Sequence, residues 1–347
     1  MATRRKSGQN AKHINLALQG GGSHGAYTWG VLERLMGDRR LHIAGLSGTS
    51  AGAMNAVVMA DGFIKDRREG AIRSIRAFWE RISETGFFNA KTSLFWKGHG
   101  SSSQVNLDST PLYAMFDIVT RLFSPYELNP MDYNPLLEII EEMIDFEELR
   151  KHTELKLFVT ATNVRTGKPR VFTTHEMTAK VLMASACLPL VFKAVEIDGE
   201  HYWDGGYMGN PSIYPLVHEC ESKDVIIIQI NPLRRDDVPQ TARDILNRLN
   251  ELSFNTSVVR EMRGFATISQ LIESGQLNNH HYAQVNFHMI EAQDDLSHLN
   301  ASSKSNTDIA FLEDLHERGW KAADRWLTQN YDNLGVRSTL DVMDVFT

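Results

Sequence analysis

Short apolar runs and longer stretches with helical spacing alternate along the chain, and this alternation is the main guide to its fold. The runs are rich in aliphatic and β-branched residues, as buried strands are. Strands are predicted at residues 13–19, 43–46, 155–163, 170–174, 224–230 and 283–290, with a hairpin at 195–207 that turns at Asp198-Gly199. Helices are predicted at residues 26–36, 51–60, 67–84, 111–123, 135–150, 177–186, 241–273 and 307–330.

The order of these elements predicts an α/β fold with a mainly parallel central sheet flanked by helices on both faces. Strands and helices alternate through the first two thirds of the chain, which favours parallel pairing because each crossover uses a helix. We expect a polar, disordered N-terminal tail at residues 1–12, a domain core at 13–232, and a mostly helical C-terminal extension at 233–347 packed on the same domain.

The residues around Ser50 fit the sharp turn that presents a catalytic nucleophile. An apolar run at residues 43–46 leads into Gly48-Thr-Ser50-Ala-Gly52, and helix-forming residues follow. Strand, G-x-S-x-G and helix in this order are the context that a nucleophile elbow requires. Gly48 and Gly52 omit the side chains that would crowd the strand and the helix. The alternative interpretation is a loop serine that caps a helix.

A second glycine-rich turn, Gly20-Gly-Gly-Ser-His-Gly25, lies between the first predicted strand and a helix. Its G-x-G-x-x-G spacing formally fits the dinucleotide fingerprint, which also needs an acidic residue about 20 positions further on. Residues 45–50 occupy that place without a carboxylate. We therefore favour an oxyanion hole, in which backbone N–H groups at a helix N-terminus bind a negative oxygen. A nucleotide-binding or regulatory module stays open as an alternative.

A serine nucleophile needs a proton acceptor, and none of the thirteen histidines has a local context that singles it out. Asp204 stands in Trp203-Asp-Gly-Gly206, where the second arm of the predicted hairpin meets a diglycine that lets a carboxylate approach another backbone. On turn statistics alone, Asp-Gly-Gly is more often a plain turn. The local sequence therefore leaves the base open between Asp204 and a histidine such as His24 or His201.

Taken in order, Gly20-Gly-Gly-x-x-Gly25, Gly48-x-Ser50-x-Gly52 and Asp204-Gly-Gly206 resemble the motifs of the patatin-like phospholipase family of Ser–Asp dyad lipid acyl hydrolases. Ala184-Ser-Ala-Cys-Leu-Pro189 is a lesser similarity. The resemblance implies a three-layer sandwich with its catalytic core at residues 13–232, Ser50 as nucleophile and Asp204 as base. It also implies an oxyanion hole formed by the glycine loop and the residue after the nucleophile, namely Gly20, Gly21, Gly22, Gly25 and Ala51. The remaining glycines of the motifs, Gly48, Gly52, Gly205 and Gly206, would support the two turns.

Two positions depart from the family's usual loop. His24 stands where Arg or Lys usually precedes the last glycine, and Gln19 stands where an acidic or other polar residue often precedes the glycines. A loop without a fixed positive charge should bind phosphate headgroups less well, so phospholipase and neutral-ester lipase both stay open. An acyltransferase, or an intracellular polyester or hydroxyacyl-ester hydrolase on the same scaffold, is a further alternative.

Composition and charge limit the partners of the protein. A net charge of −7 gives no broad attraction to nucleic acid, and the two cysteines, Cys187 and Cys220, show neither metal spacing nor a disulfide framework. No stretch approaches the ~20 apolar residues of a spanning helix. We expect no cofactor, no metal, a lipid or fatty-acyl ester substrate, and a cytoplasmic location that allows transient membrane or micelle contact. The irregular, aromatic-containing residues 85–110 suit a lid or a lipid contact, or equally a long loop that its aromatic side chains fix to the core.

Overall fold

The computed structural model describes residues 11–85, 123–152, 154–278 and 285–346. Most of the predicted tail, nearly all of the aromatic-containing stretch at 85–110, the predicted helix at 111–123 apart from its last residue, and the first two residues of the predicted strand at 283–290 lie outside these ranges. The other predicted elements can be compared with the structure.

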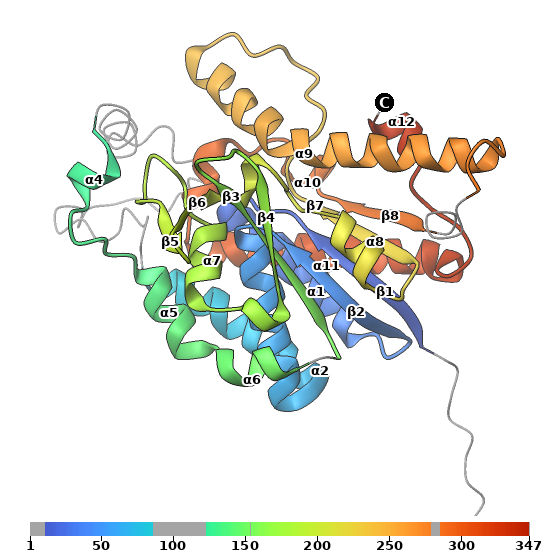
Figure 1. The fold of residues 1–347 in the computed structure, drawn as a ribbon, viewed down its shortest axis with the longest axis horizontal. Helices are drawn as coiled ribbons and strands as arrows, with labels where there is room; N and C mark the ends of the chain where they lie inside the picture. Colours follow the sequence, from blue (N-terminus) through green and yellow to red (C-terminus); the bar gives the residue numbers. More distant parts are fainter. Residues whose placement is uncertain (1–10, 86–122, 153, 279–284, 347) are drawn as a thin grey trace, which may run out of the picture.

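One mostly parallel sheet of eight strands forms the centre of the molecule (Figure 1). Its strands are β1 Lys12–Leu18, β2 Leu41–Gly48, β3 Lys156–Asn163, β4 Pro169–Thr173, β5 Val195–Ile197, β6 Glu200–Asp204, β7 Asp224–Gln229 and β8 Asn286–Glu291. Their order is β5-β6-β3-β2-β1-β7-β8, with β4 paired to β3. The five strands from β3 to β8 in this order are parallel, and β4, β5 and β6 join through antiparallel pairs. The predicted fold class is confirmed.

The described helices are α1 Gly25–Gly37, α2 Ala51–Thr85, α4 Pro125–Leu128, α5 Pro135–Met143, α6 Phe146–Lys151, α7 Ala179–Ser185, α8 Tyr214–Glu219, α9 Ala242–Glu273, α10 Gln293–Leu296, α11 Ile309–Asn330 and α12 Val342–Phe346. The predicted helix at 135–150 is wrong as a single element. Asp145 accepts hydrogen bonds from the amides of Glu147 and Glu148 and so begins α6 as a new helix. None of the described helices combines the length and the apolar composition that spanning a membrane requires.

Alternating side chains of the strands face two separate cores, because successive strand residues point to opposite faces. Leu16 and Leu18 of β1 pack in the larger core with α1, α2, α5, α7 and α11. Ala17 faces the smaller core, which contains residues of α8, α9 and α12. The sheet is therefore the middle of three layers, as expected for a parallel sheet whose strands are apolar on both faces (Figure 1).

Helices α1 and α11 approach so closely that glycine is needed on both. A Cβ on Gly30 would overlap the carbonyl oxygen of His316, and a Cβ on Gly319 would overlap the carbonyl oxygen of Tyr27. This contact fixes α11, from the C-terminal part of the chain, against the helix that follows the glycine loop.

We predict that Gly319→Ala destabilises the protein, because its methyl group must push two backbones apart; overpacking of this kind costs roughly 1–3 kcal/mol. Gly264→Ala in α9 is the matched control, since a Cβ there meets no described atom within 4 Å and alanine favours a helix over glycine by about 1 kcal/mol. Thermal and urea unfolding would measure both. Equal stability of the two variants would contradict the packing argument.

Candidate active site

Ser50 lies on a strained turn between β2 and α2. Its φ of 54° is in the left-handed region, which a non-glycine residue occupies at a cost of about 1–3 kcal/mol. A Cβ on Gly48 would lie 2.5 Å from the carbonyl oxygen of Gly52, and one on Gly52 would overlap the carbonyl oxygen of Leu18. The two glycines thus allow strand, turn and helix to approach, and Ser50 stays partly exposed at the end of the strand.

A buried hydroxyl holds this turn in place. The amide of Ser50 donates to Oγ of Ser185 over 2.9 Å, and Ser185 Oγ donates in turn to the carbonyl of Thr160 over 2.7 Å. Ser185 is fully buried at the end of α7. The strained residue is therefore anchored to β3 through one side chain.

The register of the sheet brings the end of β6 to the end of β2. Gly48 pairs with Val159 on β3, and Asp204 pairs with Ala161, two positions further along the same strand. Since β4 pairs with residues 158–162 of β3, it occupies the opposite edge, so β2 and β6 share one edge. β2 is parallel and β6 antiparallel to β3, so their carboxyl ends face each other.

Asp204 is fully buried at this junction. Its Oδ1 accepts a 2.7 Å hydrogen bond from the amide of Gly206, and Oδ2 has no conventional hydrogen-bond partner among the described residues. Burial raises the pKa of Asp204 to about 7, while the Gly206 amide, the Ser50 hydroxyl and the charge of Lys304 act to lower it. The Ser50 hydroxyl thus interacts with a carboxyl group whose pKa lies near neutrality.

The glycine loop packs directly against Ser50. A Cβ on Gly20 would lie 2.7 Å from Cβ of Ser50. The amide of Gly20 donates to Oδ1 of Asn210 over 2.7 Å, and its carbonyl accepts from Nδ2 of Asn231 over 2.7 Å. Because the Gly20 amide already donates to Asn210, it is not a free donor for an oxyanion. What Gly20 contributes is close packing against Ser50.

The remaining loop amides differ in their partners. The amide of Gly25 donates within the short 3-10 helix Gly22–His24. Hydrogen bonds from the amides of Gly21, Gly22 and Ala51 to the described part of the chain are absent. Gly22 has a φ of 58°, and a Cβ there would overlap the carbonyl oxygen of Lys304. These three amides are the donors that remain for a bound oxygen.

The two histidines considered as bases have partners other than Ser50 and Asp204. His24 is buried and its Nε2 lies 2.7 Å from Oγ of Ser303, whose own proton goes to the carbonyl of Asn300. Nε2 of His24 must therefore be the donor, and burial lowers the pKa of His24 well below its usual value. His201 faces Glu196 on the hairpin at 4.0 Å with nearly half of its side chain exposed.

Several residues that shape the site carry no local sequence signal. Asn210, which precedes a cis peptide bond, and Asn231, directly after β7, hold the glycine loop from positions distant in sequence. Lys304 and Ser303 contact the loop from the C-terminal third. The sequence does contain a signal for Ser185, because Ser185 lies in Ala184-Ser-Ala-Cys-Leu-Pro189, the segment with a lesser similarity to the family. Groups of three or more His, Cys, Asp or Glu suited to a metal ion are absent from the described residues.

We predict that Ser185→Ala destabilises the protein by about 1–3 kcal/mol, because it leaves the Ser50 amide and the Thr160 carbonyl without their partner. Ser83→Ala is the control, since the Ser83 hydroxyl donates to the nearby carbonyl of Glu80 in a solvent-exposed hydrogen bond. Urea unfolding of both variants gives the comparison. A loss below 0.5 kcal/mol for Ser185→Ala, roughly the size of an ordinary surface change, would mean that the turn does not need this anchor.

Among solved structures, the chain is similar to VipD from Legionella pneumophila, with 13% identity, a TM-score of 0.39, and coverage of 92% of this chain and 67% of that one. Comparison with curated proteins gives no match. The family model described as patatin-like phospholipase matches residues 16–217, which include the glycine loop, the Ser50 turn and Asp204. Since that match spans more than half of the sequence, the chain belongs to the patatin-like phospholipase family of lipid hydrolases.

Proposed function

We propose that the protein is a serine lipid acyl hydrolase of the phospholipase A, lysophospholipase or esterase type. In this proposal it cleaves carboxylic esters through an acyl-Ser50 intermediate, with Asp204 as the base and the glycine loop as the oxyanion hole. The observation that carries the proposal is that the meeting ends of β2 and β6 bring a partly exposed serine, on a strained turn, to a fully buried carboxyl group.

The first step is the attack of Ser50 Oγ on the ester carbonyl. Asp204 accepts the hydroxyl proton as the new C–O bond forms, which gives a tetrahedral intermediate with a negative oxygen. Because a general base works best when its pKa lies near the operating pH, a pKa of about 7 suits this role at neutral pH. The hydrogen bond from Gly206 to Oδ1 orients the carboxylate and leaves Oδ2 for the serine.

The amides of Gly21, Gly22 and Ala51 are the proposed donors to the negative oxygen. Gly21 and Gly22 lie on the loop that packs against Ser50, at the start of the 3-10 helix that leads into α1. Ala51 directly follows Ser50 and is the first residue of α2. Fixed donors of this kind cost no reorganisation during the reaction, and the loss of one typically lowers the rate by about 10² to 10³.

Collapse of the intermediate expels the alcohol, which takes the proton from Asp204 and leaves the acyl group on Ser50. Water then repeats the sequence. Asp204 accepts a proton from the attacking water, the second tetrahedral intermediate forms in the same oxyanion hole, and the serine leaves with that proton. The products are a carboxylic acid and the regenerated enzyme, so one carboxylate serves both half-reactions.

Exposed apolar side chains near Asp204 support contact with a lipid surface. Leu188 and Leu190 are 39% and 58% exposed, and they follow Cys187, whose carbonyl accepts the amide of Asp204 over 2.8 Å. Tyr207, directly after the diglycine, is 38% exposed. We propose that these residues meet the membrane or micelle that supplies the substrate.

We predict that kcat/KM on a soluble short-chain ester falls below pH 7 by about tenfold per pH unit, because protonated Asp204 cannot accept the serine proton. An ordinary aspartate would stay ionised, and the activity would persist, down to about pH 4. The measurement is a pH–rate profile of the wild type, with Asp204→Asn as the control that should be inactive throughout. A wild-type profile that stays flat to pH 5, or an active Asp204→Asn enzyme, would assign the base to another group.

We predict that the double change Leu188→Ser and Leu190→Ser lowers hydrolysis of vesicle lipids by roughly tenfold or more, because apolar burial at the surface is lost. Val336→Ser is the matched control, because Val336 is an apolar residue that is 73% exposed. It lies near Leu334, whose carbonyl accepts a hydrogen bond from Lys12 at the start of β1, the end of the strand opposite the glycine loop. Vesicle and soluble-ester turnover are compared for each. Equal losses on both substrates would argue against a surface role.

A further inference from the structure

The chain beyond the family match brings a lysine to the glycine loop. Nζ of Lys304 donates to Oδ1 of Asn231 over 2.7 Å, and Nδ2 of Asn231 donates to the carbonyl of Gly20 over 2.7 Å. Gly20 packs against Ser50, and the main chain of Lys304 itself lies against Gly22. The ammonium group is thus two hydrogen bonds from the backbone that touches the nucleophile.

A second set of contacts places the same ammonium group beside the turn that carries the base. Nζ of Lys304 lies 5.6 Å from the ring centroid of Phe254 on α9, and this ring fills the space where a Cβ on Gly206 would be. The charges of Lys304 and Asp204 attract each other. Lys304 therefore lies between the glycine loop and the Asp204–Gly206 turn, while part of its surface stays accessible to solvent.

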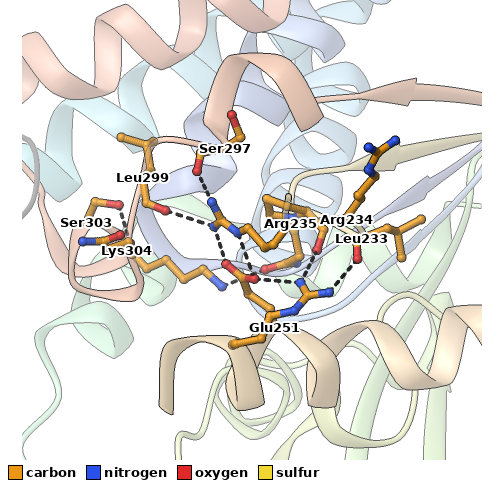
Figure 2. A network of polar contacts seen from close by, with 12 residues as sticks. Leu233, Arg234, Arg235, Glu251, Ser297, Leu299, Ser303 and Lys304 are labelled. Carbon is orange, nitrogen blue, oxygen red and sulfur yellow. Dashed lines mark hydrogen bonds and ion pairs between the residues drawn. The ribbon is translucent and has the colours of Figure 1, made fainter. Parts of the chain in front are cut away.

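The charge around Lys304 is unbalanced. Glu251 forms ion pairs with both Arg235 and Arg248, and the two arginines donate further to carbonyls of Leu233 and Leu299 (Figure 2). Lys304 points toward the same group of side chains, but the acceptor that the described residues offer to its Nζ is the neutral amide of Asn231. Two carboxylates, Glu251 and Asp204, thus face three cations next to the site. An excess positive charge among largely buried side chains favours an anionic ligand.

We propose that Lys304 is a specificity-determining residue that binds an anionic group of the ester substrate beside the glycine loop. The inference rests on the proposed function. It supplies, from the C-terminal third of the chain, the positive charge that the loop lacks at His24. An ammonium group is a compact point charge that binds phosphate or carboxylate. The substrate class is therefore acyl esters with a nearby anion, either the phosphate of a phospholipid or the terminal carboxylate of a hydroxyacyl oligomer.

Two matched substrate pairs test the proposal. The first is dihexanoylglycerol and dihexanoylglycerol 3-phosphate, and the second is the methyl ester and the free acid of a 3-hydroxybutyrate oligomer. For each pair, kcat/KM on the anionic member is divided by kcat/KM on the neutral one. We expect the wild type to prefer the anionic member of one pair, and Lys304→Gln to reduce that ratio by roughly 10- to 100-fold, the range for a hydrogen bond to a charged group.

Lys304→Gln keeps a donor for Asn231 while it removes the charge, and Lys304→Met serves as a second variant. Arg234→Gln is the control, because Arg234 pairs with Asp236 on the surface with 83% of its side chain exposed, and its ratio should match the wild type. The pair that responds identifies the source of the anion. A wild type without anionic preference in either pair, or ratios unchanged in the folded Lys304 variants, would overturn the proposal. Absence of turnover on every ester would instead refute the proposed function.

Discussion

The meeting of β2 and β6, end to end on one edge of β3, is the constraint on which the candidate site depends. It brings Ser50 and Asp204 together from positions more than 150 residues apart, with β4 holding the other edge of β3. A slip of one residue in the β3–β6 pairing would turn the Asp204 carboxylate to the opposite face of the sheet. Buried hydrogen bonds at the junction oppose such a slip, including that from Oγ1 of Thr49 to the carbonyl of Gly209 at 2.6 Å.

Residues after position 217, where the family match ends, stabilise this junction. Gln19, at the end of β1, accepts hydrogen bonds at 3.0 Å from the amides of Ile230 and Asn231. The ion pair of Glu251 with Arg235, and the hydrogen bond from Arg248 to the carbonyl of Leu233, tie α9 to the segment after β7. Together these contacts hold the glycine loop in place, so that the amides of Gly21 and Gly22 keep one orientation. A preorganised set of donors is what stabilisation of a developing charge requires.

Features set by local physical chemistry could be predicted from the sequence, and features set by distant contacts could not. The turn at Asp198-Gly199 was predicted, and both residues have positive φ, 52° and 76°, as a tight hairpin requires. The break at Asp145 was missed because an apolar stripe continues across it, although aspartate is a good helix cap. Lys304 gives no signal at all, since a lone lysine in a polar stretch is normally a surface residue and only the packing of its segment on the loop changes that. The roles of Ser50, Asp204 and the loop amides stay predictions that the geometry supports.

The most direct test of the account is labelling of the purified protein with a fluorophosphonate, followed by mass mapping of the modified peptide. We expect one label on Ser50, its loss in Ser50→Ala, and a strong reduction in Asp204→Asn, because only a serine that can pass its proton to Asp204 attacks phosphorus readily. Absence of label on the folded wild-type protein in the presence of lipid micelles, or label on a different residue, would contradict the claim that Ser50 is an activated nucleophile.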